Sequence, residues 1–328
     1  MNRLKIFLSI AVGAAVLGAC DSGSSGPSQQ IFTVLNQQNA IVFKDGGVSA
    51  STMDPGQTAG GKGGVIVNGY VPTISGGVLN WVNKEVSFEQ SEMSGETANA
   101  MVFSKIEQGS EVSSGSVLDY TTTSVLTLGG VKTGLKYGDF GYWAETIAVD
   151  IRGNLETQMT KDFWATMLIY DPAYRASMIP EDPSTYAFSG NVLGGVDLYN
   201  DQNEVEETSA ISGSITLNAN FRDKTVDAQM DLNIGTDKWY TVNYMGNSGI
   251  GADGQVQDND SLTLTGYDDN QKYSAPGTGN MSSYFQGQFM GEAGYVPEEV
   301  LGHFDIHFDA LNKMGYRPDI YGVFGAKR

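Results

Sequence analysis

The sequence predicts a mainly β protein, in which an N-terminal β-rich domain is followed by a C-terminal eight-stranded antiparallel β-barrel. Three observations lead to this fold class. First, the chain has 42 glycines among 328 residues and only 17% charged residues, which favours short strands and turns over long helices. Second, apolar and polar residues alternate with period two through the C-terminal half. Third, these alternating runs number eight, an even set that can close into a small barrel.

The first twenty residues predict a lipoprotein export signal. Residues 1–19 begin with Arg3 and Lys5, continue into an apolar run that is too short to span a bilayer, and end in small residues, as signal peptides do. The segment Leu17-Gly18-Ala19-Cys20 resembles the bacterial lipobox, and this resemblance implies that Cys20 is lipidated and becomes the mature N-terminus. Cys20 is the only cysteine, so no intramolecular disulfide can form.

A flexible tether and a strongly acidic surface are predicted beyond the signal. Residues 20–30 are rich in Ser, Gly, Pro and Gln, a composition that gives a flexible coil. The net charge is −19, and loss of residues 1–19 removes two cations and no acids, giving −19 − 2 = −21. This charge repels phosphates and argues against a nucleic-acid partner. We expect the lipid anchor to be the sole membrane attachment.

Residues 31–180 are predicted to form the N-terminal, handle-like β-rich domain. The segment Lys161–Tyr170 fits a short helix or a strand equally well, and we place the domain boundary at the proline-containing stretch Met178–Ser184. The predicted strands are Gly63–Val71, Gly77–Phe88, Asn99–Ile106, Ser116–Leu128 and Phe140–Ile151.

Residues 181–328 are predicted to form the barrel. In Ile211–Phe221 every odd position is Ile, Leu, Phe, Ala or Gly and every even position is Ser, Thr or Asn, which marks a strand with one buried face. The outer face is polar, so we expect a water-soluble barrel, and inward glycines suit a narrow lumen beside phenylalanines. The other predicted strands contain Thr185–Leu193, Val226–Ile234, Tyr240–Tyr244, Leu262–Leu264, Phe285–Phe289, Val300–Phe308 and Ile320–Ala326, and the inward glycines are Gly213, Gly287, Gly302 and Gly322.

The only two histidines, His303 and His307, fall in one predicted strand. At ~3.3 Å per residue their side chains lie ~13 Å apart, too far to hold one metal ion together. We expect both to face solvent beside Asp305, and either could ligate a haem by itself, which keeps haem open as an alternative ligand. No resident cofactor and no metal site are predicted.

Other residue patterns give no enzyme site. No Ser/His/Asp arrangement is legible, and no pair of carboxylates is singled out for glycoside hydrolysis. The acidic segments Glu204–Glu207 and Asp253–Asp260 are predicted as hairpin loops, and the second departs from the EF-hand pattern. Gly60–Gly64 resembles a phosphate loop only loosely. Trp143 and Trp164 fit either core packing or a binding face.

The C-terminal pattern is more specific than generic alternation. SSYFQGQFMGEAGYVPEEVLGHFDIHF, followed by the closing GVFGAKR, resembles the barrel domain of the transferrin-binding protein B family of surface lipoproteins. ISGSITLNANFRDKTVDAQM is similar to a hairpin of that domain, and YGDFGYWAE resembles the Y-x-x-F-G-x-W motif near the end of the family's handle domain. The chain has room for one lobe, a handle plus a barrel, and is similar to the single-lobe relatives.

The resemblance implies a non-catalytic surface receptor that captures a host or environmental protein, or haem, in iron or haem acquisition. It also implies surface display at the outer membrane and a TonB-dependent receptor as a partner, although Asp21 after Cys20 leaves the membrane face open. The alternative is a surface protein that binds a host regulator or serves adhesion without iron or haem, and a lipid-anchored hydrolase is the third. The family motifs are structural, so they identify neither the ligand nor the loops that bind it.

Overall fold

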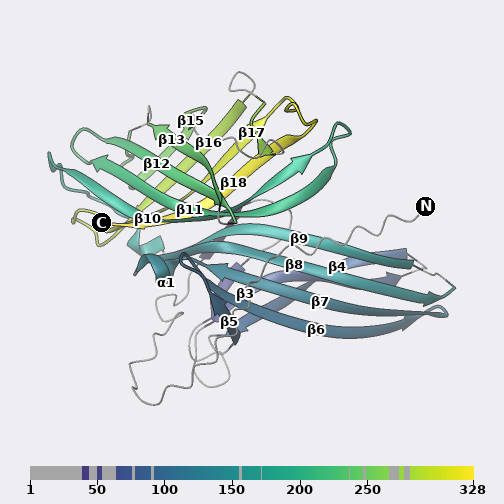
Figure 1. Ribbon diagram of the computed structural model, residues 1–328. Coiled ribbons are helices and arrows are strands. Elements are labelled where there is room, and N and C mark those ends of the chain that lie inside the picture. Colours follow the sequence, from purple (N-terminus) through teal and green to yellow (C-terminus); the bar gives the residue numbers. More distant parts are fainter. Residues whose placement is uncertain are drawn as a thin grey trace, which may run out of the picture. The chain divides into compact units, whose positions relative to one another are not determined.

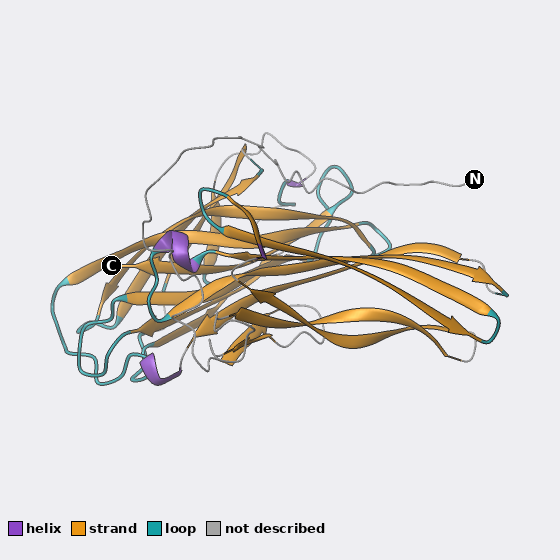
Figure 2. Ribbon diagram, turned by 90° about the horizontal axis from the view of Figure 1, so that it is seen from below, coloured by secondary structure: helices purple, strands orange, loops and turns teal. Residues whose placement is uncertain are grey.

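A computed structural model shows two antiparallel β-sheets with very little helix (Figures 1 and 2). It describes residues 39–43, 50–53, 64–75, 78–89, 92–154, 157–170, 172–235, 237–246, 249–265, 273–276 and 281–328. Cys20, the predicted tether and residues 60–63 of the Gly60–Gly64 segment lie outside these residues, so the predictions for them stand as predictions. In the described part of the chain, no helix is both long and apolar enough to cross a bilayer.

The first sheet, called the N-terminal sheet below, has nine strands in the order β4-β3-β2-β1-β9-β8-β7-β6-β5. Every pairing in it is antiparallel, and a ladder between β1 and β9 joins its two meanders. The segment Lys161–Tyr170 is therefore a strand rather than a helix. The strands are β1 (Asn39–Phe43), β2 (Ala50–Met53), β3 (Gly64–Ser75), β4 (Val78–Glu89), β5 (Met93–Glu96), β6 (Met101–Ser113), β7 (Ser116–Leu128), β8 (Gly138–Gly153) and β9 (Thr157–Tyr170).

Side chains from β3 and β4 pack against those of β6 to β9 inside this sheet. Trp143 lies fully buried in the apolar cluster, with Phe88 and Phe103. A second cluster, around Ile147 and Leu118, fills the other part of the interior. Each fully buried side chain of this size contributes roughly 1.5–3 kcal/mol through removal of apolar surface from water. Trp143 is thus a core anchor.

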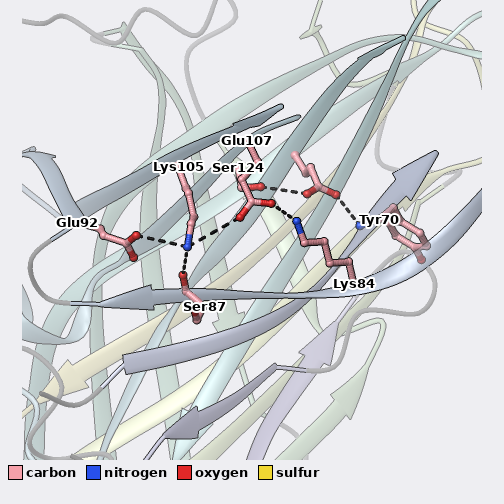
Figure 3. A network of polar contacts seen from close by, with 8 residues as sticks. Tyr70, Lys84, Ser87, Glu92, Lys105, Glu107 and Ser124 are labelled. Carbon is pink, nitrogen blue, oxygen red and sulfur yellow. Dashed lines mark hydrogen bonds and ion pairs between the residues drawn. The ribbon is translucent and has the colours of Figure 1, made fainter. Parts of the chain in front are cut away.

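A layer of polar contacts lies in the same sheet, seen in close-up in Figure 3. Lys84 on β4 pairs with Glu107 on β6, and the ammonium of Lys105 donates to the carbonyl of Ser87 at 3.2 Å. The carboxylate of Glu145 on β8, 1% exposed, accepts hydrogen bonds from the Tyr70 amide at 2.8 Å and from Ser124 Oγ at 3.0 Å.

The Glu145 carboxylate lies where β3 changes its buried side. Odd positions of β3 are buried up to Gly69, and Pro72 and Ile74 are buried after it. A side-chain Cβ on Gly69 would come within 2.7 Å of Glu145 Oε1, so a glycine is needed beneath the carboxylate. Glu145 therefore satisfies a backbone donor at an irregular point of the strand, as buried polar groups require.

The second sheet curls into the predicted barrel, with strand order β14-β16-β17-β18-β10-β11-β12-β13-β15 (Figure 1). The first and last strands, β10 and β18, pair over eleven residues from Ser189–Lys327 to Tyr199–Arg317. The strands are β10 (Thr185–Tyr199), β11 (Val205–Asn220), β12 (Thr225–Ile234), β13 (Asp237–Met245), β14 (Gln255–Asn259), β15 (Leu262–Thr265), β16 (Met281–Met290), β17 (Glu299–Phe308) and β18 (Arg317–Lys327).

The barrel has nine strands rather than the predicted eight. The additional strand, β14, lies inside the segment Asp253–Asp260, so the prediction of a hairpin loop there is wrong. β14 pairs with β16, and β15, two residues further on, pairs with β13 at the other edge of the sheet. One run of chain therefore joins both edges and nearly closes the barrel.

Hydrogen bonds to Ser283 fix the point at which this run changes partner. The Asp260 amide donates to the Ser283 carbonyl at 2.8 Å, and the Leu262 amide donates to Ser283 Oγ at 3.2 Å. In return the Ser283 amide donates to Asp260 Oδ1 at 3.1 Å. Asp260 has a φ of +53°, which asparagine and aspartate tolerate better than most residues.

The barrel interior is filled by aromatic and aliphatic side chains, as the alternation predicted. Phe285 stacks on Phe324 with ring centroids 5.4 Å apart. A Cβ on Gly302 would lie 2.2 Å from the Phe324 ring, and one on Gly322 would lie 2.7 Å from the Phe304 ring. The inward glycines at these two positions therefore make the room that the phenylalanines occupy.

The outer face is polar on β11 and β12 but apolar where the barrel meets the N-terminal sheet. There Leu193, Leu301 and Val323 are buried in a cluster with Phe140 and other residues of the first sheet, so the prediction of a wholly polar exterior is wrong. Among the outward positions of β17 and β18, Leu301 and Val323 are apolar, whereas His303, Asp305 and His307 are polar. A Cβ on Gly325 would come within 2.5 Å of the Phe140 ring, so the ring packs directly against the backbone of β18 here.

Two short helical turns flank this contact. The helix α1 (Gly130–Thr133) precedes β8, and a 3-10 turn, η2 (Pro172–Tyr174), follows β9. The chain then runs to β10 through the proline-containing stretch, with Arg175 bridging to Met290 of β16. The two sheets are thus connected both covalently and through packed side chains.

We predict that removal of residues 321–328 abolishes folding. The deletion exposes the edges of β10 and β17 and removes Phe324 from the core, and unpaired edges favour aggregation. The expected result is insoluble protein, measured as the soluble fraction and its resistance to protease. Phe324→Ala, the matched control, leaves the ladders intact and should cost about 3–5 kcal/mol of unfolding free energy. A soluble, protease-resistant deletion product would contradict the role of this strand.

Candidate functional site

The loop between β16 and β17 forms a surface pocket of about 480 Å³. The pocket is lined by Glu292, Tyr295, Val296, Glu298 and Arg328. Its chemistry is mixed: two carboxylates and one guanidinium lie beside an aromatic ring that is 67% exposed. Large exposed aromatic side chains with nearby charges are typical of protein-binding surfaces.

Backbone hydrogen bonds hold the pocket loop in place. The Gly291 amide donates to the Tyr174 carbonyl at 2.8 Å and the Gly294 amide donates to the Ser177 carbonyl at 3.0 Å. The Arg328 amide donates to the Glu298 carbonyl at 2.9 Å, which brings the end of β18 to the same place. Gly294 has a φ of +81° in the turn that presents Tyr295. The loop is therefore anchored along its length although its central side chain is exposed.

A turn of the N-terminal sheet reaches the same pocket. Lys136 Nζ donates to the Tyr137 hydroxyl at 2.9 Å, and that hydroxyl donates to Glu298 Oε2 at 3.3 Å. The hydrogen bond with Tyr137, and then the charges of Glu298 and Glu292, raise the pKa of Lys136. The pocket and the turn beside it therefore carry two cations, two carboxylates and tyrosine hydroxyl groups within a small area, and they can bind a peptide segment through complementary hydrogen bonds and charges.

Two buried carboxylates position this turn. Glu299, 1% exposed, accepts hydrogen bonds from the backbone amides of Lys136 and of Tyr137, the latter at 2.9 Å. Burial raises the pKa of Glu299, and the two amide hydrogen bonds act in the opposite direction. Because Glu299 belongs to β17 and the turn precedes β8, this contact fixes the turn to the barrel.

Asp139 holds the other side of the turn. Its Oδ1 accepts from the amides of Gly130 and Phe140, both at 2.7 Å, and the side chain is 3% exposed. Burial raises the pKa of Asp139 from 3.8 to about 7, despite these hydrogen bonds, because desolvation disfavours the charged form.

The structure separates the two histidines. His303 is 5% exposed, with its ring 5.0 Å from that of Tyr284, and burial lowers its pKa to about 4. The prediction that His303 faces solvent is therefore wrong, because the first half of β17 is buried on its outer face as well. His307 is 40% exposed, and its Nδ1 lies 2.9 Å from Asp319 Oδ1. Of the two residues kept as haem ligands, His307 is the accessible one.

The remaining sequence candidates fall into structural roles. Trp164 stacks on Tyr142 with ring centroids 4.3 Å apart, and both rings are partly exposed. Glu207, from the first acidic segment, accepts from Tyr273 and Ser209. Within the ranges that the structure describes, no group of three or more His, Cys, Asp or Glu side chains is placed to hold a metal ion.

Sequence reasoning missed this pocket. Within GEAGYVPEE, Tyr295 carries no signal beyond being an aromatic residue between two predicted strands. The pocket forms because the end of β18 brings Arg328 beside the β16–β17 loop, which lies in a different segment of the chain.

Comparison with protein-family models and with curated proteins finds no match. Among solved structures, the chain is similar to the vaccine antigen Transferrin Binding Protein B (TbpB) of Haemophilus parasuis Hp5. A single mutant of that antigen aligns at 14% identity and a TM-score of 0.39, over 85% of this chain and 45% of that one. A double mutant aligns at 13% identity and a TM-score of 0.34, over 85% and 44%. The chain thus spans less than half the length of these structures.

We predict that Asp139→Asn changes the pH dependence of stability. The folded carboxyl binds its proton more tightly than the unfolded one, so its contribution to the unfolding free energy falls as the pH rises from about 4 to about 7. Asparagine keeps the accepting oxygen without the charge. The variant should therefore gain stability over the wild type with rising pH, by up to roughly 4 kcal/mol.

Urea unfolding at pH 4, 5.5 and 7.5 measures this difference. The opposite contribution of His303, which is buried in its neutral form, is common to both proteins and cancels. Asp201→Asn, at an exposed turn, is the matched control. A difference between Asp139→Asn and the wild type that does not change with pH would contradict the buried, protonatable carboxyl.

Proposed function

We propose that this chain is a non-catalytic, lipid-anchored surface protein that captures a protein ligand through the pocket of the β16–β17 loop. The observation that carries the proposal is the exposed Tyr295 beside Glu292, Glu298 and Arg328, on a loop anchored by backbone hydrogen bonds. A preorganised loop loses little conformational entropy on binding, which favours capture of a partner. With a net charge of −19, basic surfaces are the favoured partners.

The resemblance to the transferrin-binding protein B family supports a role in iron or haem acquisition, with the ligand passed to a TonB-dependent receptor. The lipobox at Cys20 and the following tether support anchoring at the outer membrane with the binding domain exposed at the cell surface. The alternative is capture of a host regulator or an adhesion partner without iron or haem. Direct binding of haem by His307 is another version of the proposed role in iron or haem acquisition.

Binding assays with the full-length protein test the proposal against iron carriers, haemoglobin and whole serum. Tyr295→Ala combined with Glu298→Gln should weaken capture about tenfold or more, since exposed aromatic anchors commonly contribute 2 kcal/mol or more. Met314→Ala, an exposed residue in the β17–β18 loop at the other end of β17, is the matched control and should bind as the wild type. Equal capture by both variants would contradict the pocket as the binding site.

The ligand class is decided by two further readouts. Capture of an iron- or haem-carrying protein supports acquisition, while capture restricted to other serum proteins supports the regulator or adhesion alternative. Titration with haem should give a Soret shift lost in His307→Ala and kept in His303→Ala if haem binds directly. Measured turnover of a glycan or peptide would contradict a non-catalytic role.

A further inference from the structure

The strand β6 presents an open edge for most of its length. β5 pairs only with Met101 to Phe103 of β6, whereas β7 pairs with all of it. From Ser104 to Ser113, no strand in the described part of the chain covers the other side of β6. Such an edge carries backbone donors and acceptors directed away from the sheet and is a template for another strand.

The outward face of this edge is uncharged and carries two exposed apolar side chains. Ile106 is 69% exposed and Val112 is 73% exposed, and the residues between them on the same face are Gln108 and Ser110. No charged residue occurs on this face of β6, in a chain with a net charge of −19. A basic partner would have no electrostatic reason to choose this edge, whereas two acidic copies of the chain can meet here without repulsion between charges on this face.

We propose that β6 pairs antiparallel with β6 of a second copy, about a two-fold axis at Gly109, and joins two N-terminal sheets into one. Ile106 and Val112 each lie three residues from Gly109, so this register places Ile106 opposite Val112 of the other copy, twice. β-Branched pairs directly opposite each other stabilise antiparallel ladders by roughly 0.2–1 kcal/mol each beyond alanine. The register buries both exposed side chains at once.

Other registers are less favourable. An axis at Gln108 places Ile106 opposite Ser110 and Val112 opposite Ser104, so no apolar pair forms. That register would also set Lys105 opposite Glu111, but the ammonium of Lys105 already contacts Ser87, Glu92 and Glu107 within its own chain, as Figure 3 shows. The gain from the apolar pairs therefore decides the register.

The inward face of β6 is compatible with an axis at Gly109. The Tyr120 ring lies over this glycine, where a Cβ would be 2.2 Å from its Cζ, so the centre of the proposed ladder is already covered. Glu107, which would lie opposite Glu111 of the other copy, is paired with Lys84 (Figure 3). The acidic pair across the axis is thereby partly neutralised.

The strand at the other edge of the N-terminal sheet, β4, allows only a shorter ladder with a second copy. In β4, Val78 and Val82 are 61% and 48% exposed and are symmetric about Asn80. Because β4 begins at Val78, a ladder centred on Asn80 would extend over only five residues. A ladder centred on Gly109 would extend over nine, from Lys105 to Ser113, so it supplies nearly twice as many backbone hydrogen bonds.

The test measures self-association of the full-length protein, purified in detergent, by sedimentation and light scattering. The wild type should form a concentration-dependent dimer. Ile106→Lys with Val112→Lys should weaken it about tenfold or more, because like charges then lie opposite each other. Val78→Lys with Val82→Lys is the matched control and should dimerise as the wild type does.

A charge exchange tests the register. Ile106→Glu with Val112→Lys places opposite charges across the axis twice and should restore the dimer that the double lysine variant loses. All four positions are exposed, and unchanged circular dichroism would confirm that each variant folds. A monomeric wild type at all concentrations, equal loss in the β4 control, or no rescue by charge exchange would overturn the proposal.

Discussion

The strand β18 is the constraint on which the rest of the structure depends. It pairs with β10 on one side and with β17 on the other, and it is buried on both faces. Its inward side chains, Phe324 above all, fill the barrel, while Val323 and Gly325 on the outward side meet the N-terminal sheet. A strand buried on both faces needs apolar or small residues at consecutive positions, and the run GVFGA meets this requirement. Barrel closure, sheet-to-sheet contact and the position of Arg328 in the pocket all follow from it.

Buried carboxylates accept hydrogen bonds from backbone amides that strand pairing alone does not satisfy. Glu145, Asp139 and Glu299 each accept backbone amide hydrogen bonds at places where the chain turns or a strand is irregular. In each case burial raises the pKa, because the charged form loses water, and the amide donors offset part of that cost. Two of the three hold the turn that carries Lys136 and Tyr137, so the geometry of the candidate pocket depends on groups that do not line it.

The two sheets differ in how much of the backbone at their edges is paired with another strand. In the barrel, one run of chain divides into β14 and β15 and pairs with both free edges, so little backbone is left open. In the N-terminal sheet, β5 protects β6 over three residues only, and the remaining edge has Ile106 and Val112 on its outward face. Charged or proline residues usually protect such an edge from pairing, and the outward face of β6 has neither. Surface capture and self-association can therefore use separate parts of the same molecule.

The sequence by itself determined the mainly β class, eight of the nine strand positions in the barrel, and the filling of its interior, because period-two alternation reports directly which side chains face a core. It also identified Trp143 as a possible core anchor. Alternation could not place β14, because Val256 is the only apolar and the only buried residue in this strand. It also could not show that His303 would be covered. It could not predict the pocket of Glu292, Tyr295 and Arg328 either. Only the tertiary structure decided these, because they arise where segments far apart in the chain meet, and such contacts leave no periodic pattern in any one segment.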